Sequence, residues 1–135
     1  MMRVRDLMTI SCVTAPPAMP VLEARQLMIE KRIRHLLVSD GPTLVGIVTD
    51  RDIRLNLPSP ATSLSVWEIN YLLARMTLAS VMTKNVVTVE SGREATEAAQ
   101  LMLDHKIGAL PVVDRGHLVG IITETDLLRA FVKSG

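Results

Sequence analysis

The sequence repeats itself with an offset of 74 residues. "EARQLM" from Glu23 matches "EAAQLM" from Glu97, and "LVGIVTDRD" from Leu44 matches "LVGIITETD" from Leu118. Between residues 8 and 54 the alignment needs no gap, and 19 of the 47 positions are identical to those 74 residues later. Such similarity indicates a tandem duplication, and about 50 residues are too few to bury a sufficient core alone. We therefore expect two copies that fold together, at residues 3–55 and 78–132, joined by a connector at 56–77.

Each copy has the same predicted order of elements, β-α-β-β-α. A short strand is expected at 12–14 or 86–89, followed by a helix. Two apolar strands then flank a turn, in "HLLVSDGPTLVGIV" and in "ALPVVDRGHLVGII", and a second helix begins at Thr49 or Thr123. The fold class is therefore α/β (α+β), and we expect the two copies to pack sheet to sheet about a pseudo-twofold axis.

The first helix of each copy carries its own signals. In the second copy Ser91 and Glu94 have the spacing of a capping box. Ala95, Ala98, Ala99 and Met102 follow on one apolar face. In the first copy Pro20 stands in the first turn, where its missing N–H is not needed. Both patterns predict a helix that packs one face against the core.

The connector contains its own helix signal. "LPSPATS" interrupts regular structure with two prolines, and "LSVWEINYLLARM" then reads as an apolar helix. Its apolar residues exceed what one helix face needs to bury: Leu64, Val66, Trp67, Ile69, Tyr71, Leu72, Leu73 and Met76. Because a surplus apolar patch on a small protein commonly marks an interface, we expect a homodimer to which this helix contributes.

Composition excludes several classes of protein. Hydrophobic residues make up 48% of the chain but aromatic residues only 2%, so the core must be aliphatic, supplemented by eight methionines. The net charge of +1 gives no electrostatic reason to expect a nucleic-acid or membrane partner. The only cysteine, Cys12, cannot form an internal disulfide. No apolar stretch is long enough to span a membrane, and "MMRVRDLMT" lacks the apolar region of a secretory signal. We therefore expect a soluble, cytoplasmic protein.

The Thr-x-x-Asp spacing after the second strand of each copy has two interpretations. A threonine followed three residues later by an acid is a capping box, which starts a helix. A carboxylate at a helix start can also accept two hydrogen bonds from the neighbouring hydroxyls of a ribose. The two interpretations are compatible, and the spacing alone does not choose between them.

The order of these motifs resembles the cystathionine-β-synthase (CBS) domain. The resemblance is carried by Met-Thr, "VVTV", the "EAAQLM" helix and "LPVVDRGHLVGIITETDL". Two copies resemble a CBS pair, or Bateman module, over nearly the whole chain, and the connector resembles that of CBS proteins of the acetoin-utilisation (AcuB) type. The resemblance implies a non-catalytic regulatory module. Such a module binds AMP, ADP, ATP or S-adenosylmethionine in clefts between the repeats and passes the signal to a regulated protein.

The family's G-h-x-h-x-[ST]-x-x-D motif occurs in both copies. By that match Asp52 and Asp126 would accept hydrogen bonds from the ribose hydroxyls, and Thr49 and Thr123 would contact ribose or phosphate oxygens. No cofactor is required, and the adenine nucleotide is a regulatory ligand, with or without Mg²⁺. The remaining residues implied at the site are Arg51 and Lys84 near phosphates, Ser11, Cys12, Val13, Asn85, Val86 and Val87 beside the adenine, and His35, Leu36, Leu37, Ala109, Leu110 and Pro111 as the other wall.

Other functions are kept as alternatives or are not expected. A ligand-free CBS pair that serves dimerisation or protein interaction is the alternative to a nucleotide sensor. An enzyme is not expected, because the sequence shows no nucleophile–base pair, metal cluster or phosphate-binding glycine loop. A metal site is not expected either, since His35, His105 and His117 fall on different elements.

Overall fold

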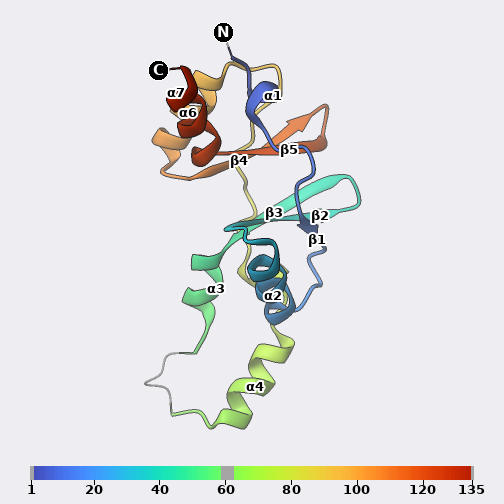
Figure 1. The fold of residues 1–135 in the computed structure, drawn as a ribbon. Coiled ribbons are helices and arrows are strands. Elements are labelled where there is room, and N and C mark those ends of the chain that lie inside the picture. The colour runs from blue at the N-terminus through green and yellow to red at the C-terminus, as the bar shows by residue number, and fades with distance from the viewer. Residues whose placement is uncertain (1, 59–62, 135) are drawn as a thin grey trace. The chain divides into compact units, whose positions relative to one another are not determined.

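The computed structural model describes residues 2–58 and 63–134 (Figure 1). The chain forms two compact units. The first unit comprises residues 13–85. The second unit comprises the N-terminal residues as far as Cys12 together with the chain from Val86 onward. The connector's second proline, Pro60, belongs to residues 59–62, which lie outside the described residues.

The first unit is a three-stranded sheet with helices. Its elements are β1 (Thr14–Ala15), α2 (Val21–Lys31), β2 (His35–Asp40), β3 (Thr43–Thr49), α3 (Asp50–Asn56), α4 (Val66–Arg75) and α5 (Leu78–Val81). β1 pairs in parallel with β2, and β2 pairs antiparallel with β3. Helices α2 and α3 cover the same face of this sheet (Figure 1).

The second unit repeats most of this plan. Its elements are α1 (Val4–Leu7), α6 (Ala95–His105), β4 (Ala109–Asp114), β5 (His117–Thr123) and α7 (Glu124–Ser134). β4 and β5 form an antiparallel hairpin, and a single parallel bridge joins Val89 to Val112 where the first unit has β1. The predicted class is confirmed, since each copy supplies a small sheet and helices. The short first strands differ in extent from the prediction, at Thr14–Ala15 and at Val89 alone.

The segment at the start of each copy lies in the unit that contains the sheet of the other copy. Thr83 exchanges two backbone hydrogen bonds with Ile47 on β3, with N···O distances of 3.1 and 2.9 Å. Thr9 does the same with Ile121 on β5, at 2.8 and 3.0 Å. The Met-Thr pair that precedes each copy therefore extends the sheet of the other copy.

Two glycines make this approach possible. A Cβ atom on Gly46 would lie 2.5 Å from the sulfur of Met82 and 3.0 Å from the carbonyl oxygen of Thr83. A Cβ on Gly120 would lie 2.7 Å from the carbonyl oxygen of Thr9. Both glycines therefore allow the leading segment to lie directly against the strand.

The cores are aliphatic, as predicted. The first unit buries side chains such as Leu36, Val48, Ile53 and Leu78. The second unit buries a corresponding set of aliphatic residues, Met102 among them. All three aromatic residues of the chain, Trp67, Tyr71 and Phe131, are exposed. Aromatic side chains therefore contribute nothing to either core.

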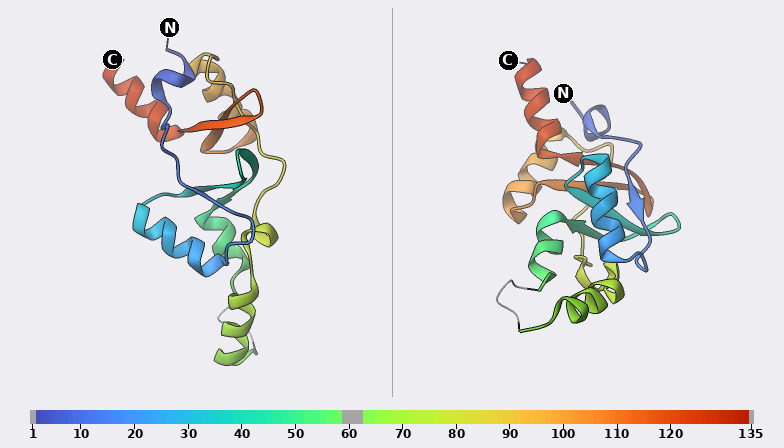
Figure 2. Two further views of the ribbon diagram at one scale, coloured as in Figure 1. Left: turned by 90° about the vertical axis from the view of Figure 1, so that its right-hand side faces the viewer. Right: turned by 60° about the horizontal axis from the view of Figure 1, so that its bottom comes forward.

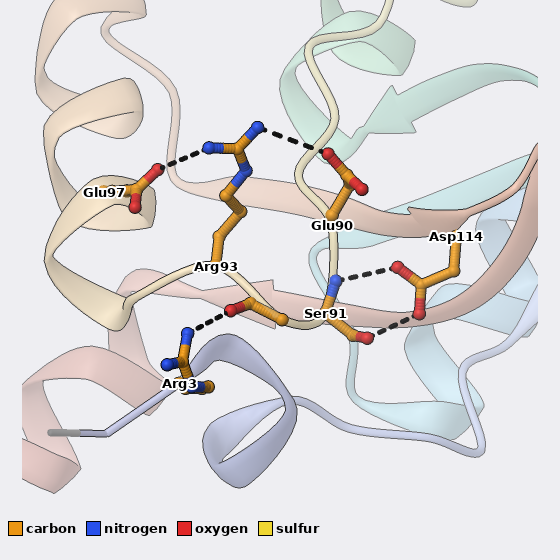
Figure 3. Close-up of polar contacts among 7 residues, drawn as sticks. Arg3, Glu90, Ser91, Arg93, Glu97 and Asp114 are labelled. Carbon is orange, nitrogen blue, oxygen red and sulfur yellow. Dashed lines mark hydrogen bonds and ion pairs between the residues drawn. The ribbon is translucent and has the colours of Figure 1, made fainter.

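The predicted capping box between Ser91 and Glu94 is wrong. Glu94 itself occupies the N-cap position of α6 and makes no side-chain cap hydrogen bond. Ser91 instead donates its backbone N–H and its hydroxyl to the carboxylate of Asp114, at 2.9 and 2.5 Å (Figure 3). The predicted apolar face of α6 is confirmed, with Ala98 and Met102 buried.

Candidate functional site

Thr49 and Asp52 form a closed pair at the start of α3. The Thr49 hydroxyl accepts a hydrogen bond from the backbone N–H of Asp52 at 3.1 Å, and the Asp52 carboxylate accepts one from the backbone N–H of Thr49 at 2.9 Å. Only Oδ2 of Asp52 accepts the hydrogen bond from Thr49 N. The cap therefore uses one of the two carboxylate oxygens.

The same arrangement recurs at the start of α7. Oδ2 of Asp126 accepts hydrogen bonds from the backbone N–H and the hydroxyl of Thr123, at 2.9 and 3.1 Å. Oδ1 of Asp126 lies 3.8 Å from a guanidinium nitrogen of Arg129, which is beyond hydrogen-bonding distance. The geometry of Thr-x-x-Asp is thus compatible with both a helix cap and a ligand site, because capping leaves one oxygen of each aspartate for another donor.

The strand register places a second predicted segment beside each pair. His35 at the start of β2 stands opposite Thr49, and Ala109 at the start of β4 stands opposite Thr123. The first helical N–H is also bound to this segment, since Glu124 N donates to Gly108 O at 2.9 Å. The sheets therefore bring the motif and the predicted opposite wall together within each unit.

The wall residues differ in accessibility. His35 is half-buried, whereas the other wall side chains are buried: Leu36, Leu37, Ala109, Leu110 and Pro111. These five residues therefore offer almost no surface to a ligand in this conformation.

The residues that follow each Met-Thr pair divide between the units. The chain passes from the second unit to the first between Cys12 and Val13, and back again between Asn85 and Val86. Ser11 is exposed, and so is Lys84, while Val87 packs against the core of the second unit. These predicted adenine-binding segments are therefore the crossing points of the chain.

Cys12 lies at one of these crossing points and is half-buried. Burial raises the pKa of its thiol above the ordinary value, and a backbone hydrogen bond only partly opposes that effect. A raised pKa leaves little thiolate near neutral pH, which does not favour Cys12 as a nucleophile.

The charges around the two motifs differ. In the first unit Asp50 is paired with Arg54 at 3.0 Å, and the exposed Arg51 stands beside it. In the second unit the residues matching these arginines are Thr125 and Leu128. The difference between Arg51 and Thr125 can be read from the sequence, whereas the pairing of Asp50 with Arg54 comes from the structure.

Glu124 is a neighbour of the second motif that the sequence analysis did not single out. Its carboxylate oxygens lie 3.2 and 3.5 Å from where a Cβ of Gly108 would stand. The signal available was Gly108 itself, because the first copy has Arg34 at the matching position. The absence of a side chain there gives Glu124 room beside the start of β4.

A polar network elsewhere in the second unit contains none of the predicted ligand residues. Arg93 pairs with Glu90 and Glu97 at 3.4 and 3.5 Å, and Arg3 donates to the carbonyl of Gly92 (Figure 3). An open cleft of about 440 Å³ lies beside these residues, between Thr88 and α6. Its charged lining is exposed, and Arg93, Glu90 and Glu97 are paired with one another, so we place the candidate site at the Thr-x-x-Asp motifs and not in this cleft.

Metal-binding clusters and membrane-spanning helices are both absent from residues 2–58 and 63–134. No group of three or more His, Cys, Asp or Glu side chains there could hold a metal ion. In the same part of the chain, no helix has the length and apolar character needed to cross a membrane.

Solved structures similar to this one are CBS domain pairs or related proteins. The crystal structure of a protein of Vibrio cholerae assigned to acetoin utilization (AcuB) has a TM-score of 0.82 and 32% identity, covering 99% of this chain and 93% of that one. The CBS domain pair of MJ0100, in complex with 5′-methylthioadenosine and S-adenosyl-L-methionine, has a TM-score of 0.82 and 28% identity, covering 99% and 98%. CBSX2 in complex with AMP has a TM-score of 0.79 and 32% identity, covering 98% and 97%.

Relatives by sequence include proteins of several sizes. A CBS domain-containing protein of Dictyostelium discoideum is 38% identical over 98 residues, which cover 72% of this chain and 68% of the relative. The homoserine O-acetyltransferase of Methanocorpusculum labreanum is 37% identical over 128 residues, which cover 93% of this chain but only 23% of that protein. The match to the enzyme is therefore confined to a part of it.

The fold and the paired motifs define a protein built from two homologous repeats. The family model for the CBS domain matches the chain twice, at residues 4–59 and 78–133. The chain belongs to the CBS domain family, and the predicted resemblance to a CBS pair is confirmed.

Proposed function

We propose that this protein is a non-catalytic regulatory module that binds an adenosine-containing ligand through Asp52 and Asp126. The observation that carries the proposal is that the helix cap uses only one oxygen of each of these carboxylates. Each aspartate closes its own helix cap with Oδ2, and Oδ1 is not needed for the cap. A ribose presents two adjacent hydroxyl donors, which a carboxylate can accept. The bound AMP, 5′-methylthioadenosine and S-adenosylmethionine of the related structures support this ligand class.

The regulatory mechanism is linkage. A ligand that binds one conformation of the pair more tightly than another shifts the population toward it, and the regulated protein reads that shift. A ligand that binds only the folded protein stabilises it, more strongly the further its concentration exceeds its dissociation constant, so it must raise the melting temperature. Mg²⁺ enters only as the companion of a polyphosphate. The proposed location is the cytoplasm, where such nucleotides are abundant.

The first test is binding to single variants. Asp52→Ala and Asp126→Ala each remove a charged acceptor, which costs ~1.5–3 kcal/mol of binding free energy, or about ten- to a hundredfold in affinity. Isothermal calorimetry with AMP and S-adenosylmethionine measures this loss. Asp52→Asn keeps an oxygen for the cap but lowers the charge, so it should retain stability and still weaken binding.

A matched control is available in α1. Asp6 accepts a hydrogen bond from the backbone N–H of Arg3 at 2.8 Å, in the same capping spacing but outside the family motif. Asp6→Ala should therefore reduce stability and leave ligand affinity unchanged. If the double variant Asp52→Ala/Asp126→Ala binds as tightly as the wild type, the carboxylates are caps only. If no adenosine compound raises the melting temperature of the wild type, a ligand-free interaction module becomes the better interpretation.

We also propose that the protein is a homodimer. Ile29 on α2 and Leu103 on α6 occupy the same position of the two repeats and are both exposed, at 59% and 72%. Leu128 and Phe131 are exposed on α7. Apolar surface of this extent favours association. Light scattering at micromolar concentrations measures the mass in solution, and a monomer at every concentration would contradict this proposal.

A further inference from the structure

Helix α4 has two apolar faces, and only one of them is used within the chain. Ile69, Leu73 and Met76 are half-buried, and Met76 packs against the core of the first unit. On the opposite side Trp67 is 84% exposed and Tyr71 58% exposed. Helix α4 projects away from the sheet of its unit, beyond α2 (Figures 1 and 2). The outer face is therefore presented to solvent along the whole helix.

The outer face also carries one charge of each sign. Taken at 100° per residue, Trp67, Tyr71 and Ala74 lie on one stripe, and Glu68 and Arg75 lie together along one side of it. The guanidinium of Arg75 lies over the Tyr71 ring, 4.2 Å from its centroid. Arg75 is thus held beside the aromatic stripe, in the last turn of the helix, while Glu68 is in the first turn.

We propose that the outer face of α4 pairs antiparallel with α4 of a second copy of this chain, about a twofold axis at Tyr71. A twofold axis pairs residues at equal distances before and after its centre. Trp67 lies four residues before Tyr71 and Arg75 four after it, while Glu68 lies three before and Ala74 three after. Trp67 therefore stands opposite Arg75 of the second copy and beside its small Ala74.

Two independent features agree on this register. Glu68 comes within one residue's rise, about 1.5 Å, of the level of Arg75 on the second copy, so opposite charges meet on the same side of the seam. The largest side chain, Trp67, meets the smallest, Ala74, which lets the helices approach closely. A parallel pairing would instead place the two copies of Glu68, and likewise of Arg75, at the same level but on opposite sides of the seam, so that no opposite charges meet. The face is thus complementary to itself in one orientation, which favours a second copy over an unrelated partner.

The seam is one contact of the proposed homodimer and not the whole interface. Ten helical residues span only about 15 Å, and a stable interface buries about 1,200–2,000 Å² in total. The inference therefore rests on the proposed homodimer, but it does not rest on nucleotide binding. Trp and Tyr at the centre make the seam a strong part of the interface, because such residues dominate binding energies.

The test uses two charge reversals in the full chain. Glu68→Arg places two arginines at each seam contact, and Arg75→Glu places two glutamates there. Each variant alone should weaken the dimer, raising its dissociation constant by about tenfold or more. Analytical ultracentrifugation measures this constant. In an equimolar mixture, one chain carries two arginines and the other two glutamates, so mixed dimers should form with the affinity of the wild type or better.

Mixing separates pairing from folding, because any damage within each variant persists in the mixture. Glu23→Arg is the matched control, since Glu23 lies in the first turn of α2 and is exposed as Glu68 is in α4. The control should dimerise like the wild type, and circular dichroism shows that all variants are folded. Single variants that dimerise normally, or a mixture no better than its components, would overturn the α4 pairing while leaving a dimer through other faces. A monomeric wild type would overturn both the homodimer and the α4 pairing. The outer face of α4 would then be a candidate surface for binding a different protein.

Discussion

At the scale of single residues, the two Thr-x-x-Asp motifs share their geometry and differ in their charge. Asp52 is near Arg51, and its neighbour Asp50 is ion-paired with Arg54 at 3.0 Å. In the second copy the residues that match Arg51 and Arg54 are Thr125 and Leu128. Arg129 lies 3.8 Å from Asp126 and is 61% exposed, much as Arg54 is at 65%. Both of these exposed arginines are screened by solvent, so the difference that remains is Arg51 against Thr125. A phosphate therefore meets less repulsion at the first motif than at the second.

We predict that the Asp52 site tolerates di- and triphosphates better than the Asp126 site, which should prefer adenosine or AMP. Calorimetry on Asp126→Ala isolates the first site, and calorimetry on Asp52→Ala isolates the second. Thr125→Arg should bring the second site closer to the first, because a guanidinium matches phosphate oxygens in charge and geometry. Equal affinity for ATP at the two isolated sites in metal-free buffer would contradict this charge argument.

The helix caps show what can be predicted from residue spacing alone and what cannot. Thr49–Asp52 and Thr123–Asp126 were predicted from spacing and are present. Ser91 and Glu94 have the same kind of spacing, yet Ser91 is bound to Asp114, 23 residues away. The local pattern failed because a carboxylate distant in sequence accepts both Ser91 donors. A spacing rule contains no information about such a partner.

At the scale of elements, the exchange of leading segments is the feature that the sequence did not reveal. The repeat predicts the helices and strands of both copies, since hydrophobic periodicity is local. It cannot assign the partner of the Met-Thr segment, because the two copies offer nearly identical strands as partners. Only the structure shows that Thr83 pairs with Ile47 and Thr9 with Ile121. The short helices α1 and α5 were missed for a related reason, since four residues are too few to show a periodicity.

The exchange predicts a strict requirement for glycine at two positions. Gly46→Ala and Gly120→Ala should each reduce the free energy of unfolding by ~1–3 kcal/mol, because the added methyl forces the leading segment off the strand. The loss should be larger at Gly120, where the obstacle at 2.7 Å is a backbone oxygen, than at Gly46, where a flexible methionine is nearest. Urea denaturation measures both. Gly92→Ala, which meets nothing within 4 Å, is the control and should be nearly neutral.

The Ser91–Asp114 contact predicts a dependence of stability on acid. Hydrogen bonds from Ser91 hold the pKa of Asp114 below its ordinary value of 3.8. A depressed pKa means that the contact stabilises the folded state fully above the ordinary value, and that this stabilisation is lost as the pH falls through the lower, folded-state pKa. Asp114→Asn should therefore be less stable than the wild type at neutral pH and should approach it in acid. A constant difference in unfolding free energy across that range would show that the charge of Asp114 is not involved.

At the scale of the whole molecule, the compact units are not the repeats. A boundary drawn from the repeat alone ends the first copy at residue 55, yet the first unit continues to residue 85. The additional residues belong to its core, since Leu78 is fully buried and Val81 is 8% exposed. All members of that core cluster lie within residues 13–85. The first unit is therefore one continuous stretch of chain, whereas the second unit needs both ends of the protein.

This difference predicts which fragments fold. A fragment of residues 13–85 retains the core of the first unit, whereas residues 13–77 lack Leu78, Val81 and the Thr83 pairing. Burying a leucine or valine contributes ~1.5–3 kcal/mol each, so the shorter fragment loses about 3–6 kcal/mol. A unit of this size has only about 3–5 kcal/mol of stability in total. Residues 13–85 should therefore give the dispersed amide resonances and cooperative melting of a folded protein, and residues 13–77 should give neither. If the shorter fragment melted at the same temperature as the longer one, the segment from 78 to 85 would be an accessory to the fold, and the repeat boundary read from the sequence would also be the boundary in folding.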